Sequence, residues 1–144
     1  MLELVLTVLA AVLVLVLALV ALGAWRFLRA TRGARCHLRE LGGHREVAVL
    51  LGRASAGRDQ KPAVGTLVRT DEVVALVPAT NGPEVQVARE SLTGASVTST
   101  FLGRTFAEPA LLLTWEENGL GDAAAMRVED PQSWVTALTT APES

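Results

Sequence analysis

Few residues in this chain have side chains suited to catalysis or metal binding. Its two histidines, His37 and His44, lie near its only cysteine, Cys36, in an arginine-rich stretch. Three nitrogen and sulfur ligands without a fourth make a poor zinc site, and no paired carboxylates, glycine-rich phosphate loop or nucleophile elbow accompany them. The sequence therefore predicts no metal site, no enzyme, no cofactor and no small-molecule substrate.

A second group of candidate residues is basic. Arg53, Arg58 and Lys61 lie in a short polar stretch, residues 53–62, where Asp59 partly offsets their charge. Clustered basic side chains can bind a lipid phosphate through charge-assisted hydrogen bonds. The three residues are thus a candidate headgroup site, and an ordinary solvated loop is the alternative.

Charge is unevenly distributed along the chain. Arginines dominate residues 26–45, whereas from Glu46 onward thirteen acidic residues face seven basic ones. Nucleic-acid binding depends on clustered Lys and Arg that release counterions from phosphates, so the acidic part argues against a nucleic-acid partner. The single cysteine excludes an intramolecular disulfide.

The amino-terminal segment predicts a membrane-spanning helix. Leu4 to Trp25 is a run of twenty-two uncharged residues that includes eight Leu and six Val. As a helix it would extend about 33 Å, against a hydrocarbon core of about 30 Å. A cleaved signal peptide would need a positive start and a shorter apolar run, and a lipoprotein would not have its cysteine, Cys36, beyond several arginines.

The residues that follow this run predict its orientation. Aromatic rings and arginines are typical anchors at the membrane interface. The short amino-terminal flank carries Glu3 and no basic residue, so the positive-inside rule places the amino terminus outside and the rest of the chain in the cytoplasm, at the plasma membrane. The predicted anchor residues are Trp25, Arg26, Phe27, Arg29, Arg32 and Arg35.

From Glu46 onward, short β-branched runs separated by Gly, Pro and Asn predict a mainly-β domain. In the run that contains Leu111, Leu113 and Trp115, these three share one face and should be core. Asp130 is a good helix N-cap, and the residues after it predict a short helix with Trp134 turned inward. The seven expected strands cover residues 46–52, 64–69, 72–77, 85–88, 95–100, 110–116 and 123–128.

The order of these elements resembles the pleckstrin-homology-like (PH-like) superfold. Gly65-Thr-Leu-Val-Arg-Thr-Asp-Glu-Val-Val-Ala-Leu-Val77 is similar to a strand pair of GRAM-type and bacterial PH-like domains, and residues 85–94 and 130–138 continue the resemblance. The layout is also similar to that of uncharacterised actinobacterial single-spanning proteins. The resemblance implies a seven-stranded PH-like barrel closed by a helix, and another small barrel, such as an OB-like one, is the alternative.

The expected organisation is a transmembrane anchor (1–28), a basic juxtamembrane linker (29–45) that ends in a Gly42-Gly43 hinge, the β domain (46–140) and a tail (141–144). The expected function is a non-enzymatic membrane-tethered adaptor with a protein partner, and a headgroup-sensing module is the alternative. One further hypothesis is that Phe101-Leu102-Gly103-Arg104 forms a loop tip that dips into the membrane. Its alternative leaves Phe101 and Phe106 in the core and Arg104 exposed.

Overall fold

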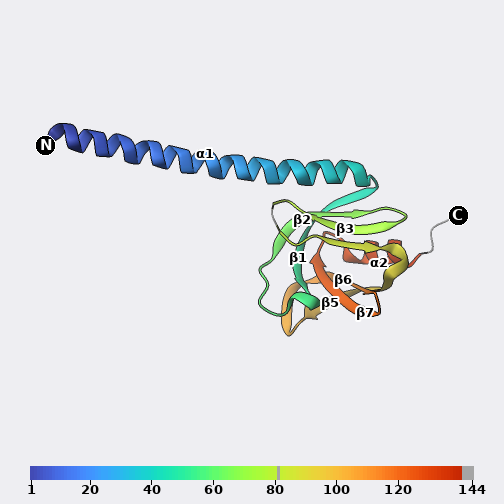
Figure 1. Cartoon of the computed structure of the whole chain (residues 1–144). Helices are drawn as coiled ribbons and strands as arrows, with labels where there is room; N and C mark the ends of the chain where they lie inside the picture. Colours follow the sequence, from blue (N-terminus) through green and yellow to red (C-terminus); the bar gives the residue numbers. More distant parts are fainter. Residues whose placement is uncertain (81, 141–144) are drawn as a thin grey trace.

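The computed structural model describes residues 1–80 and 82–140, with the side chains of Leu2, Phe27 and residues 29–38 left out. A long helix projects from one side of a β-rich domain (Figure 1). The elements are α1 (Leu2–Leu41), β1 (His44–Arg53), η1 (Ala54–Ala56), β2 (Ala63–Arg69), β3 (Val73–Pro78), β4 (Val85–Ala88), η2 (Arg89–Ser91), β5 (Leu92–Phe101), β6 (Arg104–Glu117), β7 (Leu120–Arg127) and α2 (Pro131–Thr139).

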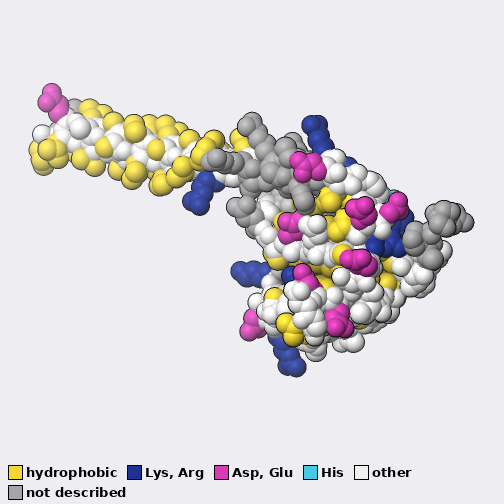
Figure 2. Space-filling model, turned by 45° about the vertical axis from the view of Figure 1, so that its right-hand side comes forward, with side chains coloured by type: hydrophobic (Ala, Val, Ile, Leu, Met, Phe, Trp, Pro, Cys, Tyr) yellow, Lys and Arg dark blue, Asp and Glu magenta, His cyan; other side chains and the backbone are white. Residues whose placement is uncertain are grey.

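Helix α1 contains one segment, Glu3–Arg26, that is long and apolar enough to cross a bilayer. None of this segment is buried in the protein, and Figure 2 shows apolar side chains on its visible surface. A helix that is apolar on all sides needs an apolar environment. The helix does not stop at the end of this segment: the basic stretch expected as a linker continues it to Leu41. Gly42, with φ +63°, ends it.

The seven strands form one antiparallel sheet in the order β4-β3-β2-β1-β7-β6-β5. This confirms the predicted layout of an apolar helix, a seven-stranded β domain and a closing helix. The ends of most strands lie within three residues of their expected positions, whereas β6 begins six residues earlier than expected. Thr70 and Asp71 lie in the turn between β2 and β3, in the gap between the strands expected at residues 64–69 and 72–77. Because β1 pairs with both β2 and β7, the first strand lies at the centre of the sheet.

The core confirms the predicted faces. Leu111, Leu113 and Trp115 are buried and belong to one apolar cluster with Trp134 of α2. Helix α2 packs against β5 and β6. Asp130 caps α2 as predicted, because its Oδ1 accepts a hydrogen bond from the Ser133 N–H at 3.1 Å.

A second buried surface lies on the outer face of β2 and β3. Val68, Ala75 and Val77 are buried although they do not belong to the core cluster. The cross-strand pairs Val68–Ala75 and Thr66–Val77 place them on the face opposite Leu67 and Leu76. Helix α1 contacts β3 and passes beside β2 and β3 in Figure 1. Helix α1 is therefore the element that lies over this outer face, and its contact with β3 joins it to the domain.

Candidate functional site

A cleft of about 540 Å³ lies where α1 ends and β1 begins. It is bounded by the turn between β2 and β3, by the start of η2 and by α2, and we call it the basic cleft. Its lining residues are Leu41, Gly43, His44, Arg69, Thr70, Asp71, Arg89, Ala137 and Thr140. Pockets that bind small ligands typically measure about 300–1,000 Å³, so the basic cleft is in that range.

Gly43 shapes the entry of the chain into this cleft. It adopts φ +76°, and a Cβ at this position would overlap the carbonyl oxygen of Arg69. The close approach allows His44 to pair with Arg69 across β1 and β2. The predicted glycine hinge is therefore the point where two backbones meet, since a residue with a side chain would separate them.

Arg69 is held over an aromatic ring. Its guanidinium carbon lies 5.6 Å from the Trp134 ring centroid, and the His44 ring lies 5.5 Å from the same indole. Trp134 is itself fixed, because its Nε1–H donates to Glu46 Oε2 at 2.5 Å, while Glu46 Oε1 accepts from the Glu129 N–H at 2.5 Å. A cation over a tryptophan face gains about 0.5–2 kcal/mol, so this stack positions the guanidinium.

Arg89, at the start of η2, also lines the cleft. Its Nη1 donates a long hydrogen bond, 3.4 Å, to the Thr70 carbonyl oxygen, and its backbone N–H donates to the Glu72 carbonyl oxygen at 2.8 Å. The Thr70 hydroxyl accepts hydrogen bonds from the N–H groups of Glu72 and Val73, which fixes the turn. The exposed carboxylate of Asp71 lies at the same turn.

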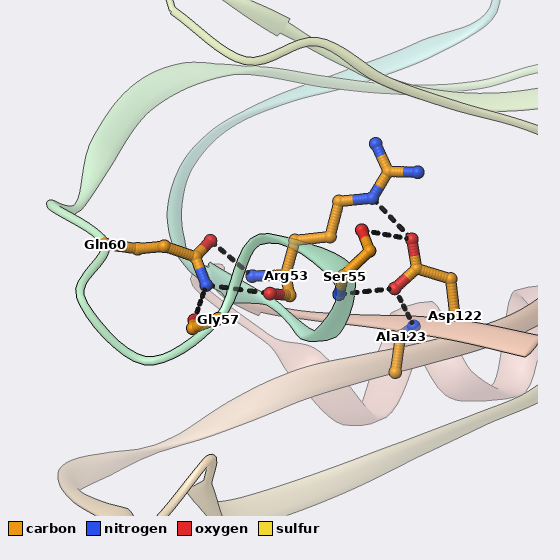
Figure 3. A network of polar contacts seen from close by, with 6 residues as sticks. All are labelled: Arg53, Ser55, Gly57, Gln60, Asp122 and Ala123. Carbon is orange, nitrogen blue, oxygen red and sulfur yellow. Dashed lines mark hydrogen bonds and ion pairs between the residues drawn. The ribbon is translucent and has the colours of Figure 1, made fainter.

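Arg53 of the predicted headgroup site is bound within the domain (Figure 3). Its Nε donates to Asp122 Oδ2 at 2.6 Å, and its guanidinium carbon lies 5.4 Å from the Trp115 ring centroid. The same carboxylate accepts hydrogen bonds from the Ser55 hydroxyl at 2.8 Å and the Ser55 N–H at 3.0 Å. We call Arg53, Ser55 and Asp122 the Asp122 clamp.

The clamp changes the acidity of its carboxyl group. Partial burial raises the pKa of Asp122, but hydrogen bonds from Arg53, Ser55 and the Ala123 N–H together outweigh burial and hold the pKa below its ordinary value of 3.8. Asp122 is therefore ionised at neutral pH and ties β7 to the loop that follows β1.

The other two predicted headgroup residues differ from Arg53. Arg58 and Lys61 are exposed on the loop between β1 and β2. Gln60 braces this loop, since its side chain accepts from the Arg53 N–H at 2.8 Å and donates to the carbonyl oxygens of Arg53 and Gly57. The structure thus separates one basic residue, which is internally paired, from two that face solvent.

The tip formed by residues 101–104 also contacts this loop. Arg104 is exposed and donates to the carbonyl oxygens of Arg58 at 2.8 Å and Gln60 at 3.2 Å. Phe101 and Phe106 are half-buried, and Leu102 and Gly103 make the turn with φ of +51° and +77°. The hairpin between β5 and β6 therefore supports the loop between β1 and β2.

The predicted anchor residues lie around the end of the apolar segment. Trp25 is 55% exposed and Arg26 is exposed, and their anchoring role stays a prediction. The side chains of Phe27, Arg29, Arg32 and Arg35 lie outside the described residues, as do those of Cys36 and His37.

Sequence reasoning did not assemble the basic cleft. It singled out His44 as a weak metal candidate, and it assigned no role to Arg89. His44, Arg69 and Arg89 come from three separate elements, and no spacing in the chain connects them. In comparisons with known proteins, no protein-family model and no curated protein matches this chain.

Proposed function

We propose that this chain is a single-pass membrane protein whose carboxy-terminal domain is a non-enzymatic, PH-like adaptor on the cytoplasmic side of the plasma membrane. The apolar segment Glu3–Arg26 supports the span. Arginines after the segment and Glu3 before it support the orientation, by the positive-inside rule. Seven antiparallel strands followed by one helix support the PH-like assignment.

The observation that carries the adaptor proposal is the edge strand β5. It forms one end of the sheet, it is ten residues long and it contains no charged residue. Soluble proteins normally blunt long edge strands with charges or proline, because an open edge can pair with another strand. Here the regular pairing with β6 covers residues 94–98, between two register shifts. This stretch suits an extended segment of a partner protein, which would add a strand.

The position of α1 would hold the edge strand β5 at a fixed distance from the bilayer. Helix α1 continues for about 22 Å beyond Arg26 and packs on the outer face of β2 and β3 through its contact with β3. A domain attached in this way cannot rotate freely about a linker. A partner bound to β5 would therefore be held at a defined height above the bilayer.

A charged substitution on the edge tests the adaptor. Ser96 is exposed and pairs with Leu112 on the outer face of the sheet, so Ser96→Lys leaves the core intact and adds a charge to the edge. Gln86→Lys, on the other edge strand β4, is the matched control. A partner isolated by in-cell crosslinking with the full-length protein should be retained by Gln86→Lys and lost with Ser96→Lys. A partner that both variants retain does not bind at β5.

Cys36 provides a test of orientation. As the only cysteine, it should react with a membrane-impermeant maleimide only after cells are broken. Labelling of intact cells would place the domain outside and refute the cytoplasmic adaptor.

Lipid-headgroup binding is the second candidate, and one observation favours it. The loop with Arg58 and Lys61 lies at the end of the domain nearest the amino-terminal half of α1 (Figure 1), so the loop is on the side of the bilayer that would hold the helix. In nanodiscs with spin-labelled anionic lipid, the amide signal of the neighbouring Asp59 should broaden, and Arg58→Ala with Lys61→Ala should reduce the broadening. Equal broadening in neutral lipid would exclude headgroup recognition.

A further inference from the structure

We infer that the basic cleft is a binding site for a soluble anion, in which the guanidinium groups of Arg69 and Arg89 bind a carboxylate or phosphate group. This inference is independent of the adaptor proposal and of the headgroup candidate, because it concerns other residues at the other end of the domain. It rests on the charge of the cleft, the free donors of the two arginines, the shape of the cleft and its place relative to the apolar segment of α1.

The charge of the cleft differs from that of the domain around it. From Glu46 onward acidic residues outnumber basic ones thirteen to seven, yet the cleft brings together Arg69, Arg89 and His44 against the single carboxylate of Asp71. Figure 2 shows basic side chains at the end of the domain away from the apolar part of α1, with acidic side chains beside them. A positive site on an acidic surface favours a small anion, which can enter where a large acidic protein surface would be repelled.

The two guanidinium groups have donors to spare. Among the described residues, no carboxylate lies within ion-pair distance of either Arg69 or Arg89. The contacts of Arg69 are with the face of Trp134, which leaves the edges of its guanidinium available, and Arg89 makes one long hydrogen bond to Thr70. A guanidinium carries five N–H donors in a planar fork that matches two oxygens of a carboxylate or phosphate. An anion between the two arginines would supply the missing acceptors.

The cleft also holds Arg69 in place before any anion arrives. Arg69 rests on Trp134, which is 1% exposed and whose indole N–H is bound to Glu46. A side chain that is already ordered loses less entropy on binding. Leu41 and Ala137 add apolar surface to the lining, so the ligand has room for a few carbon atoms beside its charged group.

The place of the cleft selects a soluble anion over a lipid of the same bilayer. Leu41, at the last turn of α1, lines the cleft, and about 22 Å of helix separates it from Arg26, the end of the apolar segment. The turn between β2 and β3, which forms one wall, lies at the end of the domain opposite the loop between β1 and β2 (Figure 1). A headgroup in the membrane that holds α1 would not reach this end.

The test uses the full-length protein in nanodiscs of neutral phosphatidylcholine. The indole N–H of Trp134 is the reporter, because Arg69 and His44 both lie against its ring. Inorganic phosphate should shift its NMR signal saturably, and chloride at matched ionic strength should not. Arg69→Gln and Arg89→Gln should each weaken phosphate binding about tenfold or more, as expected for the loss of a charge-assisted hydrogen bond. Arg58→Gln, at the other end of the domain, should leave it unchanged.

Three outcomes would overturn the inference. One is an equal response to chloride, and another is unchanged phosphate affinity in a double Arg69→Gln, Arg89→Gln variant that keeps the wild-type Trp115 signal. The third is a Trp134 shift produced by anionic nanodiscs without phosphate, which would make the ligand a headgroup. If a glutamine variant loses the Trp115 signal, Arg69→Met and Arg89→Met replace it. They keep an unbranched stem but remove the charged donors, and undiminished phosphate affinity in both also refutes the site.

Discussion

Replacing Asp122 by alanine removes the acceptor that ties β7 to the loop after β1. In the folded domain this carboxylate accepts hydrogen bonds from Arg53 Nε at 2.6 Å, the Ser55 hydroxyl at 2.8 Å, the Ser55 N–H at 3.0 Å and the Ala123 N–H at 2.9 Å. We expect Asp122→Ala to lower the free energy of unfolding of the domain while leaving the fold intact.

The size of the expected loss in unfolding free energy follows from the charged hydrogen bond between Arg53 and Asp122. A hydrogen bond to a charged group contributes about 1.5–3 kcal/mol, whereas the Ser55 groups are exposed and can bind water after the substitution. Arg53 would keep its place over Trp115 at 5.4 Å, and its side chain, 32% exposed, would be partly rehydrated. We therefore expect a loss of about 2 kcal/mol for Asp122→Ala and roughly half of that for Asp122→Asn, which retains an acceptor oxygen.

Urea unfolding of the full-length protein in detergent micelles, followed by tryptophan fluorescence, measures this loss. Arg53→Gln should cost a similar amount, and the double variant should cost little more than the larger single variant, with a coupling energy of about 1–2 kcal/mol. Glu117→Ala, exposed at the end of β6, is the control and should change stability by less than about 0.5 kcal/mol. Additive effects of Arg53→Gln and Asp122→Ala would refute the clamp and return Arg53 to the headgroup candidates.

The pH dependence gives a second check. The pKa of Asp122 is lowered in the folded protein, so its ionised form stabilises the fold at pH values above the ordinary pKa of 3.8, and this stabilisation is lost as pH falls from 3.8 through the lower folded-state value. The difference in unfolding free energy between wild type and Asp122→Asn should thus be constant near neutral pH and shrink below pH 3.8. A difference that grows on acidification would contradict the assigned direction.

Three further predictions concern packing. Glu46→Ala should cost about 1–3 kcal/mol in urea unfolding, because it leaves the buried indole N–H of Trp134 without its acceptor. Gly43→Ala should destabilise the domain more than Gly119→Ala, since both residues have positive φ but only at Gly43 would a Cβ overlap a backbone oxygen; thermal unfolding compares them. A chain without residues 1–42 should self-associate in light scattering, because it exposes the outer face of β2 and β3; a monomeric truncation would show that α1 does not cover that face.

Local patterns in the sequence were sufficient to locate the strands and the closing helix. The β-branched runs located all seven strands, and the alternation in Leu111, Leu113 and Trp115 correctly assigned the core face. Asp130 and the residues after it located α2. Such signals are local, because the backbone periods of strand and helix decide which side chains share a face.

Contacts between residues that are distant in the sequence could not be predicted from local patterns. Glu46 lies eighty-eight positions before the tryptophan that it binds, and Arg53 lies sixty-nine before Asp122. Arg53 belongs to a basic stretch, and only the pairing of β1 with β7 reveals that its partner is internal. The basic cleft was hidden for the same reason: its two arginines are distant in the sequence, one in β2 and one in η2, and only the folded chain brings them together.

The continuity of α1 links these surfaces. A flexible linker would leave the domain free to turn, but a helix that runs unbroken to Leu41 and contacts β3 fixes which end of the domain lies nearer the apolar segment. The loop with Arg58 and Lys61 lies on the side of the apolar segment, and the turn that borders the basic cleft lies at the opposite end (Figure 1). Under the proposed membrane topology, basic residues that look equivalent in the sequence are divided into a set on the side of the bilayer and a set on the side of the aqueous phase. Any break in α1 between Arg26 and Leu41 would erase that division without touching either set.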